Sequence, residues 1–131
     1  MDPPENFFKT RARSFRYAFA GWWYVIRTQR NAWIHALISV CVVILGLWLH
    51  LSARDWSVIV LAIALVWTAE FINTALEAIV DLASPEKNEL ARRSKDVGAA
   101  AVLIAALCSA AIGLLILGPP LWQKISQLLP G

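Results

Sequence analysis

Three long apolar stretches constrain this chain more than any other feature of its sequence. In a bilayer every backbone polar group must be paired within the chain, and about 20 apolar residues in a helix cross about 30 Å of hydrocarbon. The stretches therefore predict transmembrane helices over residues 32–51, 56–81 and 96–117. We expect Gly118-Pro119-Pro120 to end the last helix, because proline lacks the amide donor that a helix needs.

The composition supports a membrane protein. With 59% hydrophobic and 16% charged residues, the chain has too few polar side chains to cover a soluble globule. Its 131 residues suffice for one domain, so residues 1–131 are taken as a single membrane domain. The predicted fold class is all-α, a polytopic membrane protein. The net charge of +3 is a mild excess, and nothing in the sequence predicts a nucleic-acid partner.

Residues 7–30 predict a different kind of helix. Apolar residues recur there at helical spacing, and the basic residues fall largely on other faces. A basic amphipathic helix is typical of a membrane surface, so we predict that this segment lies in the interface. The alternative is a helix packed against another subunit. The apolar positions are Phe8, Ala12, Phe15, Phe19, Trp22 or Trp23, and Ile26.

The basic residues predict the orientation. They gather before the first span and in the 82–95 connection, which Ser84-Pro85 opens, whereas the 52–55 loop and the 118–131 tail hold one each. By the positive-inside bias, the N-terminus and the 82–95 loop are cytoplasmic and the C-terminus is outside. The two basic groups are Lys9, Arg11, Arg13, Arg16, Arg27 and Arg30, and Lys87, Arg92, Arg93 and Lys95.

Small residues recur at every fourth position of the third span, at Ala101, Ala105, Ser109 and Gly113. Such a stripe lets helix backbones approach closely in lipid. Three transmembrane helices are also too few to enclose a binding site easily within one subunit. Together these features favour a homo-oligomer.

The second span contains acidic residues that an apolar helix should exclude. A carboxylate near the bilayer centre costs about 2.5 kcal/mol or more, so something must compensate it. At helical periodicity Glu70, Asn73, Glu77 and Asp81 fall on one face. At about 1.5 Å per residue, Glu77 lies about 6 Å and Glu70 about 16 Å above Asp81. Carboxylates on one stripe can bind magnesium, and a buried one suits a general base. The alternative is hydrogen bonding between helices alone.

Lys95 and Asp96 open the third span, beside the lower end of this acidic stripe if the two helices form a hairpin. A lysine there can contact phosphate oxygens during phosphoryl transfer. The alternative is a basic anchor for the cytoplasmic side. The sequence contains no P-loop and no kinase-type glycine-rich loop. If the protein binds ATP, it does so without either of these two common phosphate-binding motifs.

Two segments carry a family resemblance. Glu70 to Asp81 follows the pattern E-x-x-N-[ST]-A-x-E-x-x-V-D, and Ala91 to Leu103 contains the A-K-D-like residues that accompany it. From about Ser14 to Leu117 the chain resembles the prokaryotic integral-membrane diacylglycerol kinase and undecaprenol kinase family. Residues 27–31 with Ile34-His35 look more like the undecaprenol kinase branch. The sequence does not choose between the two lipids.

The resemblance implies a homotrimer in the bacterial inner membrane that transfers the γ-phosphate of ATP to a lipid hydroxyl, with Mg²⁺. It implies that Glu70 is the general base and that Glu77 and Gln29 bind the metal, although many members carry glutamate at the position of Gln29. An amide contributes no charge there. The implied ATP-binding residues are Tyr17, Glu86, Lys87, Asn88, Lys95 and Asp96, and the supporting polar residues are Asn73 and Asp81.

Two other classes of function fit the same residues. In a small transporter or proton-relay subunit, buried carboxylates bind and release ions. In a catalytically inactive membrane scaffold, the loss of a carboxylate at Gln29 would have removed metal-dependent nucleotide binding. ATP turnover separates the kinase from the first class, and magnesium-dependent nucleotide binding separates it from the second.

Overall fold

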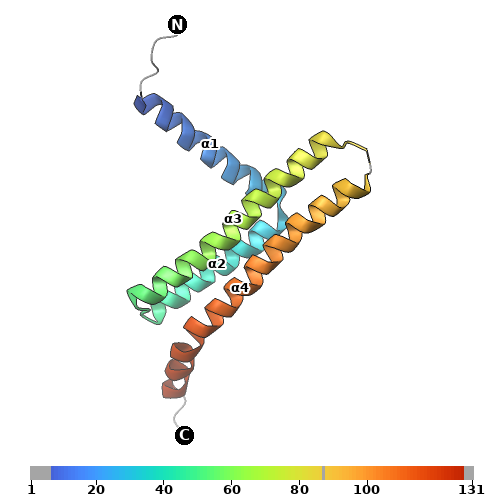
Figure 1. The fold of residues 1–131 in the computed structure, drawn as a ribbon. Coiled ribbons are helices and arrows are strands. Elements are labelled where there is room, and N and C mark those ends of the chain that lie inside the picture. The colour runs from blue at the N-terminus through green and yellow to red at the C-terminus, as the bar shows by residue number, and fades with distance from the viewer. Residues whose placement is uncertain (1–6, 87, 129–131) are drawn as a thin grey trace.

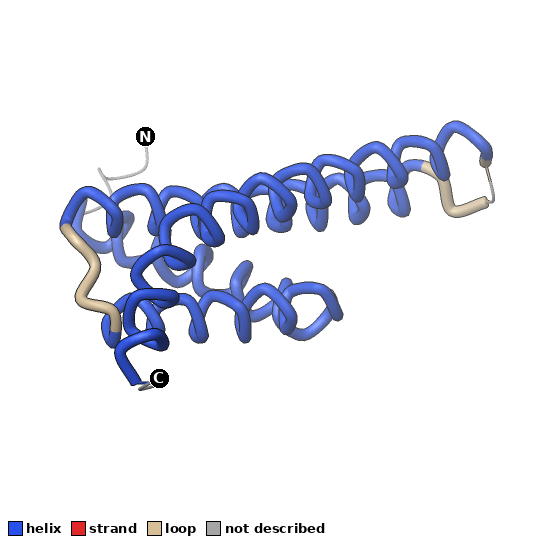
Figure 2. Tube along the Cα trace, turned by 90° about the horizontal axis from the view of Figure 1, so that it is seen from below, coloured by secondary structure: helices blue, strands red, loops and turns tan. Residues whose placement is uncertain are grey.

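The computed structural model describes residues 7–86 and 88–128, and these form four helices joined by short connections (Figures 1 and 2). The helices are α1 (Phe7–Thr28), α2 (Arg30–Trp48), α3 (Ala53–Ala83) and α4 (Glu89–Leu128). Three of them, α2, α3 and α4, are long and apolar enough to cross a membrane. The all-α prediction is therefore confirmed, with three candidate spans.

The long helices α3 and α4 form an antiparallel hairpin, and α2 lies beside α3 (Figure 1). In contrast, α1 leaves the bundle at an angle from the point where it joins α2 (Figure 1). The hairpin core is built by small and branched residues of both helices, among them Ile59, Ala62, Val66, Val102 and Ala105, all buried.

The connection between α2 and α3 is tight. His50 adopts a left-handed backbone conformation with φ of 55°. Ser52 then caps α3, because its hydroxyl oxygen accepts a hydrogen bond from the Asp55 amide at 3.2 Å. Gly46 lets the two helices approach, since a Cβ there would lie 3.0 Å from the ring of Trp56. This turn fixes α2 against the start of α3.

The fourth helix begins inside the predicted 82–95 loop. Asn88 caps it, accepting hydrogen bonds at its Oδ1 from the amides of Leu90 at 2.8 Å and Ala91 at 3.4 Å. Glu89 then pairs with Arg92 at 2.8 Å and Arg93 at 3.0 Å, one turn further along. Such pairs stabilise a helix in water, which explains why helix extends well before the apolar run.

The predicted stop at Gly118 is wrong, because α4 continues through Pro119 and Pro120 to Leu128. Proline is tolerated in membrane helices when other groups or local adjustments compensate the lost hydrogen bonds. The ribbon changes direction toward its C-terminal end (Figure 1). Lys124 holds this last part against α2 by donating to the Trp48 carbonyl oxygen at 2.8 Å.

Two of the four small residues in the α4 stripe, Ala105 and Ser109, pack within the chain, whereas Ala101 is exposed. Ala105 is buried, and the Ser109 hydroxyl donates to the Ala62 carbonyl oxygen of α3 at 3.0 Å. The small side chains thus allow α3 and α4 to approach each other. These two positions therefore give no independent sign of a partner subunit.

An aromatic cluster attaches α1 to α3. The Trp22 ring lies 4.8 Å from that of Trp67 and 4.9 Å from that of Phe71, measured between centroids. The Trp67 indole also donates to the Ser39 hydroxyl of α2 at 3.3 Å. Three helices therefore meet at Trp67.

We predict that Trp22→Ala loosens α1 from the bundle, because two aromatic contacts of about 0.5–1.5 kcal/mol each disappear. Limited proteolysis in detergent should then cleave α1 faster than in the parent protein. Trp23→Ala is the matched control, since Trp23 is exposed and its ring contacts Arg27 of the same helix. Equal cleavage of the two variants would contradict the assigned role.

Candidate functional site

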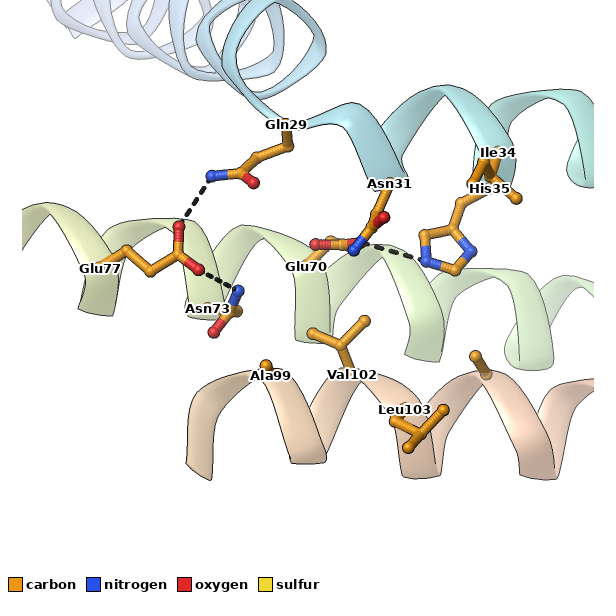
Figure 3. A pocket seen from close by; sticks show the side chains of 11 residues that line it. Gln29, Asn31, Ile34, His35, Glu70, Asn73, Glu77, Ala99, Val102 and Leu103 are labelled. Carbon is orange, nitrogen blue, oxygen red and sulfur yellow. Dashed lines mark hydrogen bonds and ion pairs between the residues drawn. The ribbon is translucent and has the colours of Figure 1, made fainter. Parts of the chain in front are cut away.

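A cavity of about 230 Å³ lies where the start of α2 meets the middle of α3 and α4 (Figure 3). One side of it is polar and comes from the α1–α2 junction, α2 and α3. The opposite side comes from α4 and is apolar. The lining residues are Gln29, Asn31, Ile34, His35, Glu70, Asn73, Glu77, Ala99, Val102, Leu103 and Ala106.

Glu70 is the most deeply buried charged side chain among the described residues, with 2% of its surface exposed. Its Oε1 lies 3.1 Å from Nε2 of His35 on α2. No donor in the described residues makes an aligned hydrogen bond to this oxygen. The carboxylate is therefore buried, with the His35 imidazole beside one of its oxygens.

Glu77 lies two helical turns along α3, and two amides hold its carboxylate. Gln29 donates from Nε2 to Oε2 at 2.9 Å, and Asn73 donates from Nδ2 to Oε1 at 3.0 Å (Figure 3). Gln29 is the single extended residue between α1 and α2, and its side chain makes no cap for α2. It is therefore free to reach Glu77.

Asn73 touches the opposite helix. Its Oδ1 is buried and has no hydrogen-bond partner among the described residues. The same oxygen occupies the space where a Cβ on Gly98 of α4 would lie. Glycine at position 98 is therefore what lets the Asn73 side chain fit between the helices.

These residues fit a magnesium ion better than a transition metal. Magnesium prefers oxygen ligands and is usually held by one or two carboxylates together with water and substrate phosphates. Here the Glu77 carboxylate has the amides of Gln29 and Asn73 beside it, and the Asn73 oxygen is unpaired. Within residues 7–86 and 88–128, no three or more His, Cys, Asp or Glu side chains converge as a metal cluster.

The structure brings together three of the four residues predicted to share a face of the second span. Glu70, Asn73 and Glu77 line the same cavity, but Asp81 does not. Asp81 is exposed and forms an ion pair with Lys95 of α4. This pair ties the ends of the hairpin beyond the cavity.

The other predicted nucleotide-binding residues that the structure describes also lie outside the cavity. Tyr17 is exposed on α1, and the Glu86 carbonyl oxygen accepts a hydrogen bond from a neighbouring serine at 3.2 Å. Asn88 caps α4, and Asp96 pairs with an arginine one turn earlier at 3.3 Å. Lys87 lies outside the described residues.

Sequence reasoning missed two lining residues, His35 and Asn31. His35 had no place in the predicted site, but it lies on α2, which begins at Arg30, and faces Glu70 (Figure 3). Asn31 also points toward Glu70 in Figure 3. The available signal was the buried charge itself, which needs a polar neighbour on an adjacent helix.

Comparison with known proteins identifies similar chains. The family described as prokaryotic diacylglycerol kinase matches residues 16–117. A diacylglycerol kinase of Synechocystis sp. is 45% identical over 109 residues, which are 82% of this chain but 62% of that protein. The matched part thus spans less than two thirds of that relative.

Two further relatives are covered more fully. An undecaprenol kinase of Bacillus subtilis is 41% identical over 109 residues, 83% of this chain and 89% of that protein. A diacylglycerol kinase of Escherichia coli is 36% identical over 83 residues, 58% of this chain and 68% of that protein.

We predict that Gly98→Ala displaces the Asn73 side chain and breaks its hydrogen bond to Glu77, with a loss of about 1 kcal/mol of stability. Thermal unfolding in detergent and the NMR signals of the Asn73 amide should both change. Gly113→Ala is the control in the same helix, because a Cβ at position 113 meets nothing within 4 Å. If both variants leave the Asn73 signals unchanged, Gly98 has no such role.

Proposed function

Because the chain belongs to the prokaryotic diacylglycerol kinase family, we propose that it is a lipid kinase that transfers the γ-phosphate of ATP to a membrane lipid alcohol. The product is phosphatidic acid if the substrate is diacylglycerol, and undecaprenyl phosphate if it is undecaprenol. The observation that carries this proposal is the placement of Glu70 and Glu77 along one cavity that is polar on one side and apolar on the other.

Glu70 is the proposed general base. It takes the proton from the lipid hydroxyl, and the alcohol oxygen attacks the γ-phosphorus. The bond from the γ-phosphorus to the bridging oxygen breaks, and ADP leaves. The burial of Glu70 and the apolar wall of α4 support this role, because a lipid alcohol can enter among apolar side chains and bring its hydroxyl to the carboxylate. Catalysis then rests on positioning, with no covalent enzyme intermediate.

Glu77 and Gln29 are the proposed magnesium ligands, and Asn73 supports them. Bound magnesium would neutralise charge on the phosphates of ATP. The contact between Gln29 and Glu77 supports the assignment, since the two side chains already lie side by side. For the nucleotide we propose Tyr17, Glu86, Lys87, Asn88, Lys95 and Asp96, with Asp81 orienting Lys95.

We propose that the protein is a homotrimer in the bacterial inner membrane, with its N-terminus and active site cytoplasmic and its C-terminus outside. The basic residues around α1 and the 82–95 segment support this orientation. The apolar residues exposed on α2, α3 and α4 support contact with lipid and partner helices. The amphipathic α1 is proposed to lie on the cytoplasmic surface.

Replacing either acidic residue should abolish the reaction. We expect Glu70→Ala and Glu77→Ala each to lower phosphate transfer by at least about 100-fold, because a base or a metal ligand is lost. The assay is transfer of labelled phosphate from Mg-ATP to diacylglycerol and to undecaprenol, with oligomer size measured in parallel. Asp55→Asn, at the opposite end of α3, is the control. Activity retained by both alanine variants would refute the roles.

Restoring a carboxylate at position 29 should strengthen metal binding. We expect Gln29→Glu to lower the Mg²⁺ concentration for half-maximal activity, since a second charge then faces the ion beside Glu77. The same variant should lose thermal stability without Mg²⁺, because two carboxylates would repel where an amide now donates. A magnesium requirement equal to that of the parent protein would count against Gln29 as a ligand.

A further inference from the structure

His35 and Glu70 face each other across the contact between α2 and α3 (Figure 3). The distance from Nε2 to Oε1 is 3.1 Å, and the two side chains are 15% and 2% exposed. Both residues line the same cavity. The imidazole is therefore largely buried against the carboxylate that would react.

Besides His35, Asn31 also points toward this carboxylate (Figure 3). Its Oε1 has no aligned hydrogen-bond donor among the described residues. Glu77, the nearest acidic residue on the same helix face, has its own amide partners and carries the same charge. A carboxylate buried without partners is costly, and it can also rotate between orientations. His35 is placed to reduce both effects.

The backbone of His35 takes part in a hydrogen-bonded connection between α2 and α3. The Ser39 hydroxyl donates to the His35 carbonyl oxygen at 2.7 Å. It also accepts a hydrogen bond from the Trp67 indole of α3 at 3.3 Å. Trp67 lies three residues before Glu70, so the register of α2 against α3 is set at the level of the His35–Glu70 contact.

We propose that His35 is a positioning residue, whose Nε2 engages one oxygen of Glu70 and leaves Oε2 to accept the proton of the lipid hydroxyl. The proposal rests on the proposed role of Glu70 as general base. The ring needs only a small rotation to align its N–H with the oxygen, because the two atoms are already at hydrogen-bond distance. His35 then acts through Glu70 without touching the reacting atoms.

Kinetics of two variants test this role. We expect His35→Leu to lower kcat by about 10- to 100-fold, while KM for Mg-ATP and for the lipid changes by less than about threefold. His35→Gln keeps an N–H donor and should recover most of kcat. His50→Asn is the matched control, because it replaces the chain's second histidine, outside the cavity, with a residue that tolerates the left-handed conformation.

NMR tests the contact without relying on activity. The chain has two histidines, so ¹⁵N-histidine labelling gives one set of signals from His35 and one from His50. We expect Glu70→Gln to shift the imidazole signals of His35 and to leave those of His50 unchanged. This measurement stays informative even if His35→Leu proves too unstable to assay.

Three results would overturn the inference. Full kcat in His35→Leu would show that Glu70 needs no such partner. Equal loss in His35→Leu and His35→Gln would show that the ring does more than donate one hydrogen bond. If the His35 signals do not shift in Glu70→Gln, the two side chains are not in contact. If Glu70→Ala instead stays active while the His35 signals do shift, the contact stands and the proposed base fails.

Discussion

The placement of one buried and one partly buried carboxylate in an apolar helix bundle is the constraint on which the rest of this structure depends. An ionised group in such surroundings needs polar neighbours, and one helix cannot supply them all. For Glu70 the close neighbour is His35 of α2, and for Glu77 the partners are Gln29 of the α1–α2 junction and Asn73 of α3. The acidic residues of α3 therefore need the α1–α2 junction and the start of α2 to pack beside them.

The junction between α1 and α2 connects the two parts of the fold. Gln29 is its single extended residue, so a change in the angle of α1 would move the side chain that holds Glu77. The aromatic contacts of Trp22 with Trp67 and Phe71 fix that angle close to the cavity. The Gly98–Asn73 contact does the same for α4, since glycine leaves room for the amide that also holds Glu77. Residues that do not line the cavity, such as Trp22 and Gly98, therefore help to determine its geometry.

The all-α class and three candidate spans followed from the sequence because hydrophobicity and length decide them. The ends of α4 did not follow. At its start, the Asn88 cap and the ion pairs of Glu89 form helix in a stretch whose polarity predicted a loop. At its other end, Pro119 and Pro120 remain inside the helix, because proline is tolerated when other contacts, here between Lys124 and Trp48, hold the chain. A side-chain cap and ion pairs therefore extend the start of α4, and packing against α2 accompanies its continuation past the two prolines.

The sequence by itself determined which residues of α3 share a face, because helical periodicity fixes the angular positions along one helix. Glu70, Asn73 and Glu77 accordingly line one cavity. Only the tertiary structure decided the partners from outside α3: His35 for Glu70, Gln29 for Glu77, and Lys95, which pairs with Asp81 outside the cavity. Those contacts depend on how far each helix slides and rotates against the next. That register is set by packing of many side chains, and no spacing along a single segment specifies it.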